Sequence, residues 1–231
     1  MNNLILVRHG QSLWNKEKRF TGWADVDLTS EGKSEAEYAG QLIKSINIDL
    51  NYFFTSKLKR AMHSLDIILK ILNKESVEVI KNEALNERHY GGLTSLNKEE
   101  TKKKYGEEQV KIWRRSFEIP PPPITMDHPF KDKINSNIKS ESLKDTFNRV
   151  VPYYQKEIEP LIFKKKNILV VFHGNSCRAL LMKIFNISRE NIIKFEIPTG
   201  NPLLIQFNDN FEVKNYRYLD NQRAKKIFFN T

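Results

Sequence analysis

Short apolar runs alternate with amphipathic stretches over most of this chain. Runs rich in Val, Ile, Leu and Phe, of the length typical of buried strands, lie at 4–7, 50–56, 76–81, 167–174 and 202–208. Between them, apolar residues recur with helical spacing at 29–45, 57–72 and 175–185, and Thr29 or Ser30 is the expected N-cap of the first helix. Because strands alternate with helices, the pattern predicts an α/β fold of three layers, with a mostly parallel sheet and helices on both faces.

The alternating pattern breaks between about residues 97 and 145. Its first part, 97–119, has the composition of a charged helix, and the prolines at 120–123 cannot continue a helix. The stretch that follows, up to Ser142, is polar and has no apolar periodicity. We expect one domain over 1–231, in which this segment is an insertion over the active site.

Composition narrows the possible partners. The chain has 231 residues and a formal net charge of +10. Its lysines are scattered, and no zinc-finger spacing, RNA-binding aromatic motif or basic coiled-coil region is present, which favours a small anion over nucleic acid. No apolar run approaches the roughly 20 residues that cross a bilayer, and polar residues follow Val7 at once, unlike a signal peptide. We therefore expect a soluble, unexported protein of the cytoplasm without a membrane partner.

The single cysteine, Cys177, cannot form an intrachain disulfide, which fits a reducing compartment. It falls in an expected helix just after a strand, and this position favours packing over a nucleophilic role.

Two histidines follow two of the predicted strands in the same way. His9 lies in Arg8-His9-Gly10 after the first strand, and His173 precedes Gly174 after the fourth. Ligands of open α/β sheets bind at the carboxyl ends of the strands, so the histidines meet at one site if these strands are neighbours. The alternative is that each is a polar residue in a turn.

Two further strand ends supply an arginine and a carboxylate. Arg60 falls in the first turn of the helix at 57–72, where the helix dipole disfavours a cation unless an anion lies in front of it. Glu87 lies in the loop after the third strand and is a candidate proton donor. Arg60 could equally face solvent, and Glu87 could simply pair with Arg88 or with solvent.

The chemistry of this group of residues points to phosphoryl transfer without a metal. The sequence has no carboxylate cluster for Mg²⁺, no zinc-ligand spacing and no Walker-type phosphate loop. Guanidinium groups bind phosphoryl oxygens bidentately, and a neutral imidazole accepts a phosphoryl group at pH 7.

Several motifs resemble those of the cofactor-dependent phosphoglycerate mutases of the histidine phosphatase superfamily. They are RHGQSLWN, FTGWADVDLTSEG, TSKLKRA, NERHYGGL, KYGEEQVKIWRRS, HGNSCRAL and IPTGNPL, and they cover nearly the whole chain. RHG alone indicates only the superfamily, whereas ERHYG and WRRS in this order are much more specific and point to the mutase branch.

The resemblance implies a role for each matching residue. His9 is the histidine that is phosphorylated, Glu87 the proton donor, and His173 the residue that hydrogen-bonds the phosphoryl group in transfer. Arg8 and Arg60 clamp that group. The positions implied to bind substrate are Gly10, Gln11, Ser12, Asn15, Thr21, Gly22, Arg88, Tyr90, Lys98, Arg114, Arg115, Gly174 and Asn175. The substrates are 2- and 3-phosphoglycerate, the phosphoryl donor that primes His9 is 2,3-bisphosphoglycerate, and no metal is expected.

The chain also departs from the family pattern. Gln11 replaces an acidic residue, Thr94-Ser95 replaces Gln-Gly, and the segment from Pro123 to Glu141 and the tail after Tyr218 are short. Two alternatives follow: a phosphatase of the same superfamily, in which water takes the phosphate from His9, and a non-catalytic protein that binds a phosphorylated ligand. We also expect a homodimer.

Overall fold

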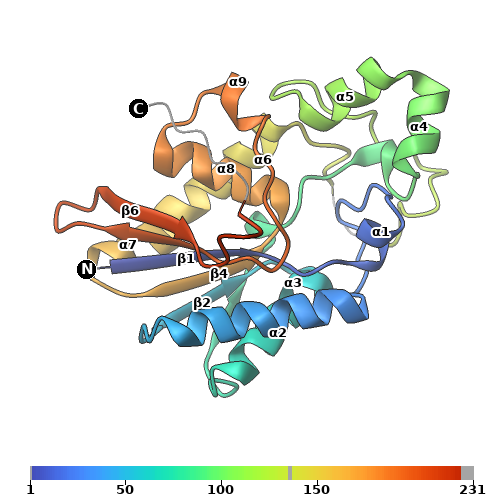
Figure 1. The fold of residues 1–231 in the computed structure, drawn as a ribbon. Helices are drawn as coiled ribbons and strands as arrows, with labels where there is room; N and C mark the ends of the chain where they lie inside the picture. The colour runs from blue at the N-terminus through green and yellow to red at the C-terminus, as the bar shows by residue number, and fades with distance from the viewer. Residues whose placement is uncertain (1, 135–136, 225–231) are drawn as a thin grey trace.

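The computed structural model describes residues 2–134 and 137–224, which form a six-stranded sheet between two layers of helices (Figure 1). The strand order is β3-β2-β4-β1-β5-β6. The first four of these strands are parallel, and β5 and β6 continue the sheet antiparallel. The strands are β1 (Asn2–Arg8), β2 (Tyr52–Thr55), β3 (Val79–Lys81), β4 (Ile168–Phe172), β5 (Leu203–Phe207) and β6 (Val213–Tyr218). The predicted α/β class is confirmed.

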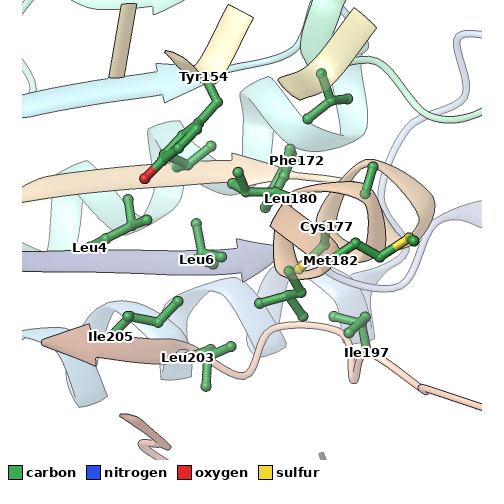
Figure 2. Packing of buried hydrophobic residues seen from close by; sticks show 14 of the residues in the cluster. Leu4, Leu6, Tyr154, Phe172, Cys177, Leu180, Met182, Ile197, Leu203 and Ile205 are labelled. Carbon is green, nitrogen blue, oxygen red and sulfur yellow. The ribbon is translucent and has the colours of Figure 1, made fainter. Parts of the chain in front are cut away.

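The two faces of the sheet bury separate apolar clusters. Side chains alternate along a strand, so Leu4 and Leu6 of β1 face one layer while Ile5 and Val7 face the other. The larger cluster packs under α6 and α8 and contains Cys177 (Figure 2). Burial raises the pKa of the Cys177 thiol to about 12, so it stays protonated and behaves as a core side chain.

The helices follow the amphipathic stretches of the sequence. Helices α2 and α3 cover one face of the sheet and α6 and α8 the other (Figure 1). The α-helices are α1 (Leu13–Lys16), α2 (Ser30–Ser45), α3 (Lys59–Ile71), α4 (Lys98–Tyr105), α5 (Glu107–Arg115), α6 (Leu143–Tyr153), α7 (Glu159–Phe163), α8 (Gly174–Phe185) and α9 (Arg189–Ile192). Two 3₁₀ turns, Glu83–Leu85 and Gly91–Leu93, flank the loop of Glu87, and a π-helical turn, Tyr154–Ile158, joins α6 to α7.

Two expectations about local structure need correction. The charged segment at 97–119 is not one helix, because Gly106 adopts a φ of 85° and separates α4 from α5. The sequence pattern also missed β6, whose residues are mostly exposed at the edge of the sheet and so lack an apolar run. Thr29 is the N-cap of α2, as expected, and its side chain accepts a hydrogen bond from the Gly32 amide.

The topology places β1 and β4 side by side. Arg8 at the end of β1 is in register with Phe172 at the end of β4, so the residues that follow them emerge at one edge of the sheet. Among the described residues, no helix combines the length and the apolar character that crossing a membrane requires.

Candidate active site

His9 and His173 meet at the carboxyl ends of β1 and β4. Their ring centroids lie 5.0 Å apart, and both side chains are buried. After His9, Gly10 packs directly on Gly32 at the start of α2. A Cβ at Gly10 would lie 2.0 Å from the Gly32 carbonyl oxygen, so only glycine fits there. The sequence predicted that the two histidines meet if their strands are neighbours, and β1 and β4 are neighbours.

The hydrogen bonds of His9 define its tautomer. Its Nδ1 lies 2.6 Å from the carbonyl oxygen of Gly10, which can only accept, so Nδ1 carries the proton. Its Nε2 therefore keeps a lone pair, and Arg60 Nε donates to it at 3.3 Å. Burial and the nearby Arg60 and Arg8 guanidinium groups hold the pKa of His9 well below its usual value. The ring is thus neutral at pH 7 and can act as a nucleophile.

Two arginines flank His9. Arg60, in the first turn of α3, is buried and donates to the carbonyl oxygens of Gly22 (2.7 Å) and Ala24 (3.0 Å). Burial lowers the pKa of Arg60 to about 10, which still leaves it charged at pH 7. Arg8 Nη1 donates to the Ile197 carbonyl at 2.7 Å, whereas its buried Nε has no partner among the described residues. A guanidinium with an unused donor is ready to bind an anion.

Glu87 lies in the loop between the two 3₁₀ turns, and its carboxylate is held by backbone amides. Its Oε1 accepts hydrogen bonds from the amide of Arg88 (2.8 Å) and from that of Asn175 in the first turn of α8 (3.1 Å). Both bonds are to the same oxygen, so Oε2 is available to give or take a proton. The side chain is only 9 % exposed and faces the cavity described below.

His173 is the N-cap residue of α8 and lies behind His9. Its Nε2 shares a hydrogen bond of 2.7 Å with Ser56 Oγ, and its buried Nδ1 has no partner in the described part of the chain. Burial, with Arg60 next in importance, holds the pKa of His173 well below its usual value. The ring is therefore neutral and can donate or accept one hydrogen bond at Nδ1.

A cavity of about 350 Å³ opens beside His9, and most of the candidate residues line it. It is bounded by the end of β1, by the first turns of α3 and α8, by the segments 19–22 and 196–199, and by α4 and α5 of the 97–145 segment. Among the predicted residues, its lining includes Arg8, His9, Asn15, Thr21, Gly22, Arg60, Glu87, Tyr90, Lys98, Arg114, Arg115, Gly174 and Asn175.

The other predicted residues support the site from behind. The Ser12 hydroxyl accepts from the Asn15 amide at 3.2 Å and caps α1, and the Gln11 side chain accepts from the Thr29 hydroxyl at 3.0 Å. Arg88 Nη2 donates to the Arg114 carbonyl at 2.9 Å, and its guanidinium lies over the ring of Tyr90. The predicted residues that do not line the cavity are thus Gly10, Gln11, Ser12, Arg88 and His173.

The comparisons with known proteins agree with this geometry. Residues 4–216 match the family model of the histidine phosphatase superfamily (branch 1). A 2,3-bisphosphoglycerate-dependent phosphoglycerate mutase of Pelagibacter ubique is 48% identical over 98% of this chain and 99% of its own length. The mutase of the same name from Hydrogenobaculum sp. is 46% identical over 98% of this chain and 95% of its own. The chain belongs to the phosphoglycerate mutase family of the histidine phosphatase superfamily.

Solved structures show the same fold at low sequence identity. A putative α-ribazole-5′-P phosphatase from Escherichia coli superposes with a TM-score of 0.74 at 20% identity, covering 97% of this chain and 98% of the other. A mycobacterial glucosyl-3-phosphoglycerate phosphatase gives a TM-score of 0.70 at 18% identity, covering 94% and 97%. At these identities the likeness extends to the fold alone.

Sequence reasoning missed several residues that line the cavity of this mutase-family chain: Arg19, Phe20, Arg178, Glu196, Ile197, Pro198 and Thr199. Arg178 is the most informative of them. It follows Asn175 by three positions on α8, and residues with this spacing share a helix face. Its guanidinium donates to the Asn175 side-chain oxygen at 3.1 Å and twice to the Phe195 carbonyl. Helical spacing from Asn175 could have found it.

The electrostatics of the cavity favour a polyanion. Among the described residues that line it, seven are cationic (Arg8, Arg19, Arg60, Lys98, Arg114, Arg115 and Arg178) and two are acidic (Glu87 and Glu196). Burial lowers the pKa values of Lys98 and Arg115, because each cation is partly removed from water. Burial alone would raise the pKa of Tyr90, but the charge and hydrogen bond of Arg88, together with Lys98, lower it to about 8. An anion in the cavity would relieve this crowding of positive charge.

Proposed function

We propose that the protein is a 2,3-bisphosphoglycerate-dependent phosphoglycerate mutase, which interconverts 2- and 3-phosphoglycerate in glycolysis and gluconeogenesis in the cytoplasm. The observation that carries the proposal is the near-full-length identity of 44–48% to curated mutases of that name. The cation-rich cavity beside a neutral imidazole supports it, because substrates with phosphate and carboxylate groups need several cations.

His9 is the nucleophile in this proposal. Its Nε2 lone pair attacks phosphorus, and the bond to the leaving oxygen breaks as the bond to Nε2 forms. Arg8 and Arg60 neutralise the phosphoryl oxygens during transfer. His173 does not line the cavity, but it lies against His9, and we propose that its partnerless Nδ1 hydrogen-bonds the same group once that group is on His9; the pairing of its Nε2 with Ser56 orients the ring. The two guanidinium groups supply positive charge where other phosphoryl-transfer sites use a metal ion, so we propose that no metal is needed.

Glu87 acts as the general acid and base. Its Oε2 protonates the leaving oxygen when His9 is phosphorylated, and takes a proton from the attacking hydroxyl when the phosphoryl group returns. The two backbone amides on Oε1 keep the carboxylate facing the cavity in both steps.

The cavity offers donors that fit 2,3-bisphosphoglycerate, which supplies the phosphoryl group that primes His9. Arg8 Nε and Thr21 Oγ1 belong to lining residues and lack partners in the described part of the chain. We propose that Lys98, Arg114 and Arg115 hold the carboxylate and the second phosphate, and that Asn15, Thr21, Gly22, Tyr90, Gly174 and Asn175 complete the binding site. Gly10, Gln11, Ser12 and Arg88 fix its shape.

The insertion at 97–145 covers the site in this proposal, since α4 carries Lys98 and α5 carries Arg114 and Arg115. A mutase must keep water from the phosphohistidine, whereas a phosphatase must admit it. The decisive experiment incubates the protein with 3-phosphoglycerate and a trace of 2,3-bisphosphoglycerate, and follows 2-phosphoglycerate and free phosphate together. A mutase forms 2-phosphoglycerate faster than phosphate; the reverse order would identify a phosphatase.

A His9→Ala variant separates catalysis from binding. It should fold, bind bisphosphoglycerate and take up no acid-labile phosphate. Acid-labile label on this variant would assign the nucleophile to another residue. Light scattering on the same samples tests the predicted homodimer.

A further inference from the structure

A buried ion pair lies behind the loop that carries Glu87. Arg149 on α6 binds Glu141, just before the same helix, through Nε (2.6 Å to Oε1) and Nη2 (2.9 Å to Oε2). The side chains are 16% and 3% exposed, respectively. Neither residue lines the cavity, so the pair does not touch the substrate.

The pair hydrogen-bonds the loop on both sides of Glu87. Arg149 Nη1 donates to the Ala84 carbonyl, and Nη2 donates to the carbonyl of Glu87 itself, each at 2.8 Å. Glu141 Oε2 accepts from the His89 amide at 2.8 Å, and the Glu141 amide donates to the His89 carbonyl at 2.9 Å. The ion pair therefore bonds to the backbone before, at and after the carboxylate residue.

A third side chain completes this support. The indole Nε1 of Trp23 also donates to the Glu87 carbonyl, and the Arg149 guanidinium lies over the Trp23 ring. Two donors on one carbonyl oxygen fix the orientation of the Glu87–Arg88 peptide unit. That unit contains the Arg88 amide, which in turn binds Glu87 Oε1. The orientation of the carboxylate thus depends on Arg149.

We propose that Arg149 and Glu141 are positioning residues for proton transfer by Glu87. The inference rests on the proposed function, in which Glu87 is the general acid and base. A buried ion pair contributes little to stability compared with apolar residues of the same size. Here most of its remaining hydrogen bonds go to the Glu87 loop, so its effect should appear in the step that moves a proton.

The test compares two phosphoryl donors with different leaving groups. Transfer from bisphosphoglycerate releases phosphoglycerate as an alcohol, and its leaving oxygen needs a proton from Glu87. Transfer from p-nitrophenyl phosphate releases a stable phenolate, which needs no proton. Phosphorylation of His9 is measured in single turnovers, at enzyme concentrations that make slow transfer measurable, for the full chain with Arg149→Lys and with Glu141→Gln. Displacing a catalytic group by about 1 Å can cost on the order of 100-fold.

We expect Arg149→Lys to slow transfer from bisphosphoglycerate by about 10- to 100-fold and transfer from p-nitrophenyl phosphate by less than about 3-fold. In steady state, kcat should fall and KM should stay within about 2-fold, because the cavity lining is unchanged. Glu141→Gln, which keeps the shape of the side chain, should show the same selectivity with a smaller loss.

Val150→Ala is the matched control, since Val150 is the next residue on α6 and is fully buried in the apolar cluster. It should lower the melting temperature without changing the ratio of the two transfer rates. The proposal is overturned if either variant, Arg149→Lys or Glu141→Gln, loses transfer rate equally with both donors. It is also overturned if either variant loses no transfer rate with either donor. Glu87→Gln is the reference: if it is not itself selective for bisphosphoglycerate, the role of Glu87 is wrong, which is a separate failure.

Discussion

Acidification should destabilise the folded protein through its buried histidines, and His89 allows the effect to be calculated. His89 is fully buried beside Trp23, and its Nδ1 accepts a hydrogen bond from the Gly91 amide at 2.9 Å. Burial lowers the pKa of His89 to about 4, with Arg149 adding to the shift and Glu141 opposing it. A proton on Nδ1 would also replace the acceptor with a donor that faces the Gly91 N–H.

The sign and size follow from proton linkage. The unfolded chain binds a proton at His89 below a pKa of about 6.5, whereas the folded chain does not until about pH 4. Stability is therefore lost as the pH falls from about 6.5 to about 4. For this one residue the slope is about 1.2 kcal/mol per pH unit at pH 5.5, and the loss between pH 7.5 and 5.5 is about 1.3 kcal/mol. His9 and His173 shift in the same direction and add to it.

Urea denaturation followed by tryptophan fluorescence measures this loss. The free energy of unfolding is determined at pH 7.5 and 5.5 for the wild type and for His89→Gln, whose amide oxygen can still accept from Gly91. The variant should lose about 1.3 kcal/mol less than the wild type between the two pH values, whatever its stability at pH 7.5. His63→Gln is the control, because His63 is partly exposed and bonded to Asp27. Equal pH dependence in the wild type and His89→Gln would refute the reasoning.

Three further predictions concern catalysis. Glu87→Gln removes the transferable proton and should lower kcat about 10²- to 10⁴-fold; a loss of only a few-fold would assign acid–base catalysis to another group. Arg114→Ala and Arg115→Ala should raise KM for 3-phosphoglycerate far more than they lower kcat, because binding in the ground state and transition state is lost alike; the opposite pattern would place them at the reacting phosphoryl group. The short segment from Pro123 to Glu141 should admit more water, so the phosphohistidine should hydrolyse faster than in a relative with a longer insertion; equal half-lives would show that the missing residues never sealed the site.

The strand ends of the sheet were predictable because each combines an apolar run with polar residues directly after it. Leu4–Val7 before Arg8-His9 is such a case, and the neighbouring position of β1 and β4 then brought His9 and His173 together. Strand β6 was not predictable in this way, since an edge strand with mostly exposed residues needs no apolar face. Its place in the sheet comes from pairing with β5, which no local pattern encodes.

Most of the residues that line the cavity were predictable, but which predicted residues line it and which lie behind it was not. The resemblance to the family implied Gln11 and Ser12 as readily as Asn15, yet their side chains bind Thr29 and the Asn15 amide instead of lining the cavity. Ser12 is an N-cap, and capping residues look the same in sequence as ligand-binding ones. Nothing in the sequence indicated that Glu141 and Arg149 support the site, because the backbone groups that they bind, at Glu87 and His89, lie more than 50 residues away along the chain.

In the described part of the chain, seven cations gather around one cavity, and this has a consequence for the lifetime of the protein in the cell. Like charges held close together repel, so the folded chain carries an electrostatic cost that the unfolded chain avoids. An anion that binds only the folded state offsets this cost and adds about 2.7 kcal/mol of stability at 100 times its Kd. Unfolded molecules are the ones that proteases remove. We therefore expect the abundance of this enzyme to rise and fall with the concentration of its own substrates, without any change in its synthesis.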